Sequence, residues 1–365
     1  MSIIQTQKLN YIDALRGIAI LMVIVHHTSQ QGSVVTPYWF SKLCSLGTRG
    51  VQLFFVASAF TLYRSYRNRI LNENKPVKNF FIRRFFRIAP IYYLAILYFI
   101  FHKQIGAPYW LGNQALISSS NIGSNVFFVN GINPYWINSL VPGGWSITVE
   151  VMFYSLFPFL FLKIKSINNA FTFLIVTLII KLVVQEVLIQ FQMIPSDYIW
   201  REFIYYNLAS QLPVFAIGII MFFLIENIKN INLVSKNIKM ISVILLLLQV
   251  GSTVDFLFIN HIFFAVIFLV FGVILSKGYL GFISNKVILY IGKISFSMYI
   301  IHFIVISWLK YFNLIDFTKN AILNYSIRLL LVVAISVVFS TVTYKLIEVK
   351  FQELGKKIIV KLETT

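Results

Sequence analysis

The chain has 365 residues, of which 58% are hydrophobic and only 12% are charged, and its mean hydropathy is +0.80. These values exclude an ordinary soluble enzyme and predict an all-α polytopic membrane protein. Lysine and arginine number 31 against 12 acidic residues, but they lie between apolar runs. We attribute their excess to membrane topology and anionic lipid, and expect no nucleic acid partner. The single cysteine, Cys44, excludes an intramolecular disulfide.

Ten segments are apolar over about the 20 residues that a helix needs to cross a bilayer. In chain order they span residues 10–30, 46–64, 80–101, 146–162, 170–191, 203–225, 238–254, 258–276, 287–309 and 322–344. If the N-terminus lies inside, most lysine and arginine residues fall in inner connections, which predicts that both termini are cytoplasmic. We expect a retained first helix, one membrane domain over residues 1–350, and a short basic cytoplasmic tail over residues 351–365.

The first segment carries ionisable residues near both of its ends, in the sequence DALRGIAILMVIVHH. Such groups are costly at bilayer depth and are usually functional. Arg16 and His27 are eleven positions apart, about three helical turns, so they share a face from which His26 points roughly 80° away. Asp13 lies three positions before Arg16 and can pair with it. We expect a polar face that ends at His27. The structural alternative is an interfacial Asp13–Arg16 pair with both histidines near the outer headgroups.

A basic cluster covers the end of the second span and the start of the third, in RSYRNR and IRRFFRIAP. Arg84 and Arg87 are three positions apart, and Arg83 and Arg87 are four apart, so these side chains are neighbours on a helix. Arginine favours bidentate contacts with phosphate, so one interpretation is a phosphorylated ligand at the inner face. Positive-inside topology and membrane phospholipid would account for the same residues.

The longest outer connection, residues 102–145, alternates turn residues with aromatic ones. A loop of this length without clear secondary structure is usually functional or disordered. It leads into GGWSITVEVMFY, where Trp145 and Ser146 precede Glu150 by about one turn. We expect Glu150 to orient an imidazole or to hold a hydroxyl group. Trp145 and Ser146, together with Asp13 of the first segment, are predicted to contact a substrate. The structural alternative buries Glu150 through hydrogen bonds to Ser146 or to another helix.

Weaker signals lie elsewhere in the chain. His302, in the ninth span, is interpreted more simply as a structural histidine, and the small residues 57–59 indicate close helix packing. Arg328 and Lys181 are charged residues within spans, and the sequence identifies no partner for them. The motifs GxxxxGK[ST], GxGxxG, HExxH and GxSxG are absent, which argues against an ATPase, a nicotinamide enzyme, a zinc peptidase and a hydrolase-fold esterase.

Six stretches of the sequence, in this order, resemble the acyltransferase-3 family of integral membrane acyltransferases. They are YIDALRGIAILMVIVHH, GVQLFFVASAF, IRRFFRIAPIYYL, WSITVEVMFY, GKISFSMYIIHF and YKLIE, between residues 11 and 348. The first, third and fourth are the specific ones. The resemblance implies transfer of an acyl group, typically acetyl from acetyl-CoA, to a hydroxyl of an extracytoplasmic glycan such as O-antigen, capsule or exopolysaccharide. It also implies a multi-pass protein of the cell inner membrane.

The resemblance further implies roles for individual residues. The essential pair of the first helix would be Arg16 and His27, the first acidic position of the Trp-Ser motif would be Glu150, and the acyl-CoA site would include Arg84 and Arg87 with Arg83. The family often has acids where Gln52 and Val151 stand, so no carboxylate role is assigned there. Many members also carry an extracytoplasmic hydrolase-like domain, which this sequence does not show. We therefore expect that any second transfer step either needs another protein or does not occur.

On this interpretation the partners are acyl-CoA as donor, a surface glycan or lipid-linked saccharide as acceptor, and membrane lipids, without a metal. A homo-oligomer is compatible with the sequence. His27 would act as a general base or carry the acyl group transiently. A rival of another class is a transporter or flippase for a glycan or lipid-linked intermediate. In that protein the path would be lined by Arg16, His27, Glu150 and Arg328. A third is a scaffold subunit of a glycan-assembly complex.

Overall fold

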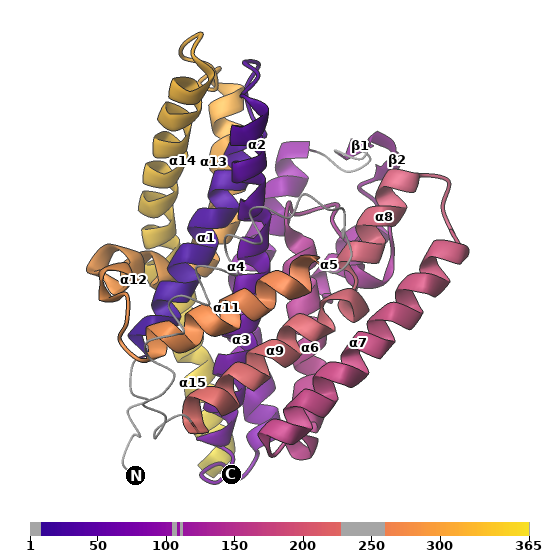
Figure 1. Cartoon of the computed structure of the whole chain (residues 1–365), viewed down its shortest axis with the longest axis vertical. Helices are drawn as coiled ribbons and strands as arrows, with labels where there is room; N and C mark the ends of the chain where they lie inside the picture. The colour runs from indigo at the N-terminus through magenta and orange to yellow at the C-terminus, as the bar shows by residue number, and fades with distance from the viewer. Residues whose placement is uncertain (1–8, 104–107, 110–111, 228–259, 365) are drawn as a thin grey trace. The chain divides into compact units, whose positions relative to one another are not determined.

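The computed structural model describes residues 9–103, 108–109, 112–227 and 260–364 (Figure 1). Seven helices in these ranges are long and apolar enough to cross a membrane, or eight if a sharply bent pair counts as one span. The prediction of an all-α polytopic membrane protein is therefore confirmed. The predicted span at 238–254 lies outside the described residues. The chain divides into two compact units, and each is treated below by itself.

Unit 1 comprises residues 1–57, 225–255 and 263–340. Its first span is α1, an uninterrupted helix, so the spacing argument for Arg16 and His27 applies to it. The described elements of this unit, including those it shares with unit 2, are α1 (Asn10–Ser29), α2 (Tyr38–Ser45), the 3-10 turn η1 (Leu46–Arg49), the start of α3 (Gly50–Arg67), most of α11 (Asn260–Ser276), the 3-10 turn η5 (Gly281–Ser284), α12 (Lys286–Lys293), α13 (Ser295–Tyr311) and most of α14 (Ala321–Thr343).

Glycines allow two elements of unit 1 to approach α1 closely. A Cβ at Gly292 would lie 1.8 Å from the carbonyl oxygen of Asp13, and a Cβ at Gly17 would lie 2.4 Å from that of Ile288. Helix α12 therefore lies directly against the first turns of α1 (Figure 1). A Cβ at Gly47 would lie 2.1 Å from the carbonyl oxygen of Met22, so η1 packs further along the same helix. Such contacts through small residues are typical of helix packing in membranes.

The predicted span at 287–309 is not one straight helix. It consists of α12 and α13, which meet at Ile294 with a bend of 80°. Apolar periodicity could not predict this break, because its surroundings come from another part of the chain. Gly292, just before the bend, has no side chain to keep it away from the backbone of α1.

Unit 2 comprises residues 58–224, 256–262 and 341–365. Helix α7 is its most exposed apolar helix, since only 11% of its most apolar window is buried, as expected for a helix that faces lipid. The main helices of the unit are the end of α3, α4 (Pro76–Lys103), α6 (Gly144–Lys163), α7 (Ile167–Gln190), α8 (Asp197–Tyr206), most of α9 (Leu208–Asn227), a π-helical stretch η6 (Tyr344–Glu348) and α15 (Val349–Thr364).

Aromatic rings form much of the core of unit 2. Phe153 of α6 stacks on Phe215 of α9 with ring centroids 4.1 Å apart. Phe80 of α4 stacks on Phe157 of α6 at 5.4 Å. Tyr63 of α3 donates a hydrogen bond to the carbonyl oxygen of Ile164, just after α6. Each of the two aromatic pairs joins two helices, and offset aromatic pairs stabilise a core beyond the area that they bury.

The predicted outer loop, residues 102–145, contains secondary structure that the sequence did not reveal. Strand β1 (Pro108–Tyr109) pairs antiparallel with β2 (Gly112–Leu116), and helix α5 (Ser119–Val126) and the 3-10 turn η2 (Asn130–Ile132) follow. Ser118 caps α5 by accepting a hydrogen bond from the backbone N–H of Asn121. The expectation of a loop without clear secondary structure was therefore wrong.

Buried amide side chains hold this segment together. Asn121 donates to Oγ of Ser139 at 2.8 Å, and Oδ1 of Asn125 accepts from the hydroxyl of Tyr92, on α4, at 2.7 Å. Asn130 is buried as well. These contacts join residues far apart in the chain, so no local pattern predicts them. A buried amide whose hydrogen bonds are satisfied fixes a loop as firmly as apolar packing does.

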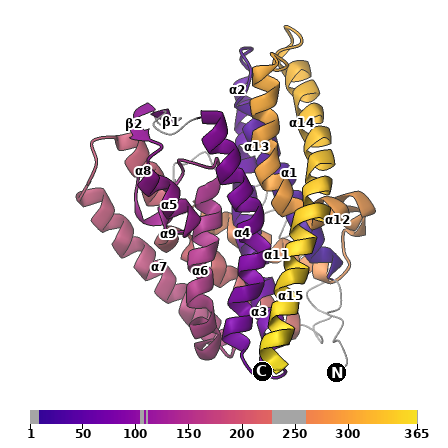
Figure 2. The ribbon, with the colours of Figure 1, turned by 180° about the vertical axis from the view of Figure 1, so that it is seen from behind.

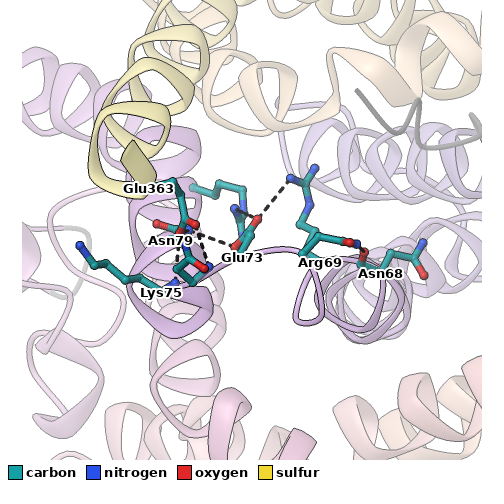
Figure 3. Close-up of polar contacts among 9 residues, drawn as sticks. Asn68, Arg69, Glu73, Lys75, Asn79 and Glu363 are labelled. Carbon is teal, nitrogen blue, oxygen red and sulfur yellow. Dashed lines mark hydrogen bonds and ion pairs between the residues drawn. The ribbon is translucent and has the colours of Figure 1, made fainter. Parts of the chain in front are cut away.

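The predicted tail at 351–365 is helical over its described residues, as part of α15, and this helix packs along α4 (Figure 2). A Cβ at Gly355 would lie 3.0 Å from Cβ of Phe86, so the two helices touch there. The carboxylate of Glu363 accepts hydrogen bonds from the backbone N–H groups of Asn74 at 2.7 Å and Lys75 at 3.0 Å, and from Nδ2 of Asn79 at 2.6 Å (Figure 3). An anion at the amino end of α4 also stabilises the helix dipole.

Candidate active site

The two adjacent histidines of α1 contact different elements of unit 1. A Cβ at Gly47 of η1 would lie 3.0 Å from Cβ of His26. The ring of His27 lies instead against α13, with centroid distances of 4.6 Å to Phe303 and 5.5 Å to His302. The different orientations agree with the helical spacing. The contact between His27 and His302 was not predicted, because nothing in the local sequence of either residue indicates it.

A hydrogen bond to Gln30 favours one tautomer of His27. Its Nδ1 lies 3.3 Å from Oε1 of Gln30, and because an amide oxygen only accepts, Nδ1 carries the hydrogen. The neutral ring then has its lone pair at Nε2, which forms no hydrogen bond with any described residue. An imidazole held at one nitrogen and open at the other is arranged as a general base requires.

Asp13 and Arg16 lie half-buried in the first turns of α1. The contact between Gly292 and the carbonyl of Asp13 places α12 next to this part of the helix. Arg16 and His27 are thus residues of one straight helix within unit 1, whereas the proposed acid Glu150 belongs to unit 2. Each group is described with the neighbours of its own unit.

Glu150 has two hydroxyl donors on the same carboxylate oxygen. Tyr154, one turn further along α6, donates to Oε1 at 2.6 Å, and Ser58 of α3 donates to the same atom. Glu150 forms no other hydrogen bond with a described residue, so Oε2 can accept from a ligand. Ser146 is not a partner of Glu150, since its hydroxyl donates to the carbonyl oxygen of Gly143 at 3.0 Å. The i, i+4 spacing could have identified Tyr154, whereas Ser58 is 92 positions away.

The three arginines of α4 have different surroundings. Arg83 donates two hydrogen bonds to Glu73, at 2.7 Å and 3.1 Å, so its guanidinium is already bound to a carboxylate. Arg84 packs on the rings of Phe80 and Tyr154, with Cζ 5.6 Å from each centroid. Neither Arg84 nor Arg87 forms a hydrogen bond or ion pair with a described residue. An anion can therefore bind Arg84 and Arg87 without breaking an ion pair of the described structure, whereas at Arg83 it must displace Glu73.

Trp145 and Ser146, two of the three residues predicted to contact a substrate, are both buried. Trp145 is 7% exposed and stacks on Tyr206, with centroids 4.3 Å apart and planes inclined by 23°. Ser146 is 5% exposed. Their contacts organise the amino end of α6, and Glu150 follows one turn later on the same helix.

The intramembrane charges for which the sequence identified no partner have partners in the structure. Arg328 lies 3.6 Å from Oδ1 of Asp316 and donates to the carbonyl oxygen of Ile315 at 2.9 Å. The backbone N–H of Ser33 donates to Asp316 at 2.9 Å, and this hydrogen bond is the main reason that the pKa of Asp316 is lowered. Lys181 donates to Oε1 of Gln185 at 2.7 Å. Over the described ranges, His, Cys, Asp and Glu form no group of three or more that could hold a metal ion.

Several curated proteins are similar to this chain. A candidate O-acetyltransferase of Staphylococcus aureus (strain COL) is 23% identical over 96% of this chain and 59% of its own length. The O-acetyltransferase OatA of S. aureus (strain NCTC 8325) is 24% identical over 95% of this chain and 57% of its own length. The peptidoglycan O-acetyltransferase OatA of Listeria monocytogenes is 29% identical over 43% of this chain and 25% of its own. The chain thus spans somewhat more than half of the relatives that it matches throughout. No solved structure matches it.

A family model for the acyltransferase domain, Acyl_transf_3, matches residues 9–345. The match includes α1 with His27, α4 with Arg84 and Arg87, and α6 with Glu150. The match therefore covers the helices that carry the predicted residues of unit 1 and those that carry the predicted residues of unit 2. The chain belongs to the acyltransferase-3 family.

Proposed function

We propose that this protein is an inner-membrane O-acetyltransferase that moves an acetyl group from cytoplasmic acetyl-CoA to a hydroxyl of a cell-envelope glycan. Membership of the acyltransferase-3 family supports acyl transfer, and the names of the relatives support acetyl as the group and oxygen as its acceptor. The observation that carries the mechanism is the arrangement of His27, with Nδ1 hydrogen-bonded to Gln30 and Nε2 open.

The proposed reaction is a direct transfer that uses this arrangement. Nε2 of His27 takes the proton from the acceptor hydroxyl, and the oxygen attacks the carbonyl carbon of the acetyl thioester. The C–S bond then breaks, its electron pair goes to sulfur, and the thiolate of CoA takes the proton from Nε2. The proton removed from the hydroxyl therefore leaves on the thiol, and His27 returns to its initial state.

The other predicted residues are assigned to the two substrates. Arg84 and Arg87 bind the CoA phosphates, because arginine forms bidentate hydrogen bonds with phosphate oxygens and these two have no internal carboxylate partner in the described structure. Arg83 joins them only if it leaves Glu73. Arg16, with Asp13, carries the polar face of α1 from the inner side toward His27. Oε2 of Glu150 accepts a hydrogen bond from a substrate.

Deletion of the gene followed by complementation tests the proposal. The envelope glycan of wild-type cells, and not of deleted cells, should give acetyl signals by NMR, which would also identify the acceptor. His27→Ala should restore no acetylation at normal membrane abundance, whereas the matched control His26→Ala should restore most of it. Acetylation by His27→Ala cells would remove His27 from the mechanism, and unchanged glycan in deleted cells would refute the activity.

The bend between α12 and α13 is the one observation that favours the rival function, because transporters build sites from broken helices. Such proteins typically have broken helices in pairs, and the described residues contain one such bent pair. Purified protein given radiolabelled acetyl-CoA and membrane extract separates the two functions. An acetyltransferase labels a saccharide in the extract, whereas a transporter labels none.

A further inference from the structure

One carboxylate lies between two arginines near the start of α4. Glu73 belongs to the connection between α3, which ends at Arg67, and α4, which begins at Pro76. Arg83 donates two hydrogen bonds to its carboxylate, at 2.7 Å and 3.1 Å, and Arg69 pairs with the same group (Figure 3). An arginine that binds both oxygens of a carboxylate in this way has the geometry with which arginine also binds phosphate.

The guanidinium of Arg69 is only partly satisfied by Glu73. Its Nη1 lies 3.7 Å from Oε1 of Glu73, which is an ion pair but is too long for a hydrogen bond. Its Nε–H is buried and has no acceptor among the described residues. A buried donor without a partner is destabilising, so a native structure that keeps one needs an explanation. The donors of arginine form a rigid fork, which suits an anion with several oxygens.

The charges of this cluster are unequal. Glu363 and Lys75 attract each other at the start of α4, so Glu73 is the carboxylate that remains for both Arg69 and Arg83. The pKa of Arg69 is lowered, mainly by burial and also by the charge of Arg83, and Glu73 offsets this only in part. A phosphate monoester carries a charge of about −1.5 to −2 at pH 7. Such a group matches two arginines better than a single carboxylate does.

Arg83 joins this cluster to the arginines that are assigned to the donor. It directly precedes Arg84 on α4 and lies one turn before Arg87, so the three side chains leave neighbouring positions of one helix. CoA has phosphate groups in two places, a diphosphate on the 5′ oxygen of its ribose and a monoester on the 3′ oxygen. A diphosphate bound by Arg84 and Arg87 leaves the nearby 3′-phosphate to a second cationic group.

We propose that Arg69 and Arg83 form a subsite for a phosphate monoester, which the 3′-phosphate of CoA enters in place of the carboxylate of Glu73. No covalent bond changes, because phosphate oxygens only replace carboxylate oxygens at the two guanidinium groups. Glu73 can leave because it lies in the connection between two helices and in neither of them. The inference rests on acetyl-CoA as the proposed donor and names the part of it that this cluster recognises. Phosphatidic acid carries the same chemical group, so the test separates the two sources.

Binding to the purified full-length protein in phosphatidylcholine nanodiscs tests the subsite without requiring acetyl transfer. Calorimetric titrations with CoA and with dephospho-CoA, which lacks only the 3′-phosphate, give the Kd of each compound. We expect the wild-type protein to bind CoA about tenfold or more tightly than dephospho-CoA, as for the gain of hydrogen bonds between charged groups. Equal Kd values would overturn the proposal.

Three variants assign the preference for CoA to this cluster. Arg69→Gln should bring the two Kd values close together. Lys78→Gln is the matched control, because it also removes one positive charge, from an exposed residue of α4, and it should leave the preference unchanged. Glu73→Gln should bind CoA severalfold more tightly than the wild-type protein, with a smaller change for dephospho-CoA, because the group that competes for the arginines has lost its charge.

Each variant has a result that contradicts the proposal. A preference for CoA that survives Arg69→Gln, or that falls equally in Lys78→Gln, would overturn the subsite. Unchanged or weaker binding of CoA by Glu73→Gln would overturn the exchange with Glu73. The comparison of wild type with Arg69→Gln decides the subsite even if Glu73→Gln does not fold.

Phosphatidic acid in the nanodiscs distinguishes a lipid headgroup from the donor. If the lipid is the ligand, phosphatidic acid raises the thermal midpoint of the wild-type protein and not that of Arg69→Gln, while CoA and dephospho-CoA bind equally, and this result would overturn the assignment to CoA. The two levels of inference stay distinguishable. A protein that prefers CoA but transfers no acetyl group keeps the subsite and refutes the proposed function, whereas an active protein that binds both compounds equally refutes the subsite alone.

Discussion

The hydroxyl of Tyr154 donates a 2.6 Å hydrogen bond to Glu150, while the ring of Tyr154 lies beneath the guanidinium of Arg84. One side chain thus contacts both the proposed acid of α6 and a proposed phosphate-binding arginine of α4. These two contacts use different parts of Tyr154 and can be removed separately. The ring contact is also a cation–π interaction, which gains strength away from water.

Removing only the hydroxyl of Tyr154 should disturb its hydrogen bond to Glu150, whereas removing its ring should also disturb the contact with Arg84. Tyr154→Phe keeps the ring, so we expect the turnover of acetyl transfer to fall about tenfold, as for loss of a hydrogen bond to a charged group, with little change in KM for acetyl-CoA. Tyr154→Leu should also raise that KM severalfold. The control is Tyr93→Phe, which removes a hydroxyl bonded only to the carbonyl oxygen of Val126. Identical kinetics for Tyr154→Phe and wild type would separate this hydroxyl from catalysis.

Glu73→Gln should destabilise unit 2. Glu73 accepts two hydrogen bonds from Arg83 and lies 3.7 Å from Arg69 (Figure 3). Removal of the carboxylate charge leaves partly buried arginines uncompensated, which costs about 3 kcal/mol. Thermal unfolding in detergent should show a lower midpoint. Glu353→Gln, at an exposed glutamate on α15, is the control and should leave the midpoint unchanged. Equal midpoints for both variants would show that the Glu73 ion pairs add nothing to stability.

Gly292→Ala should disturb the contact between α1 and α12. The new Cβ would lie 1.8 Å from the carbonyl oxygen of Asp13, so one helix has to move, at a cost of about 1–3 kcal/mol. Gly281→Ala is the matched control, because its Cβ would meet nothing within 4 Å. We expect a lower thermal midpoint and reduced membrane abundance for Gly292→Ala alone. Normal abundance and an unshifted midpoint would mean that the helices separate without cost.

Asp316 should contribute stability that depends on pH. Hydrogen bonds from Ser33 lower its pKa below the ordinary value of 3.8. A carboxyl whose pKa is lowered on folding stabilises the folded state above its unfolded pKa, and the contribution disappears as the pH falls through the folded pKa. The midpoint of wild type should therefore exceed that of Asp316→Asn at neutral pH, and the difference should shrink below about pH 3.8. A difference that stays constant down to pH 3 would assign the effect to hydrogen-bond geometry alone.

The membrane class and most helix positions follow from the sequence, because long apolar runs have few alternatives in a bilayer. The orientations of His26 and His27 also follow, since both lie on one regular helix. The contacts of Glu150 follow only in part: Tyr154 is one turn away on α6, whereas Ser58 reaches it from α3. His302 approaches His27 only through the packing of α13 on α1, which no local periodicity records.

The sequence also could not distinguish the three arginines of α4. By spacing, Arg83, Arg84 and Arg87 are equivalent candidates for binding an anion. Their difference depends on Glu73, which lies ten positions before Arg83 and reaches it because the chain turns back before α4 begins. The bend at Ile294 was missed for a similar reason, since its surroundings belong to α1.

The carboxylate of Glu363 completes the amino end of α4, and this has a consequence for biosynthesis. The backbone N–H of Asn74 donates a hydrogen bond to the carboxylate of Glu363, and the ribosome adds Glu363 to the chain 289 residues after Asn74. Translation proceeds at about 5–20 residues per second, so roughly 15–60 s pass between the synthesis of the beginning of α4 and that of Glu363. The first turn of α4 therefore lacks this carboxylate while the helix enters the membrane, and the junction between α4 and α15 can form only after residue 363 has been made.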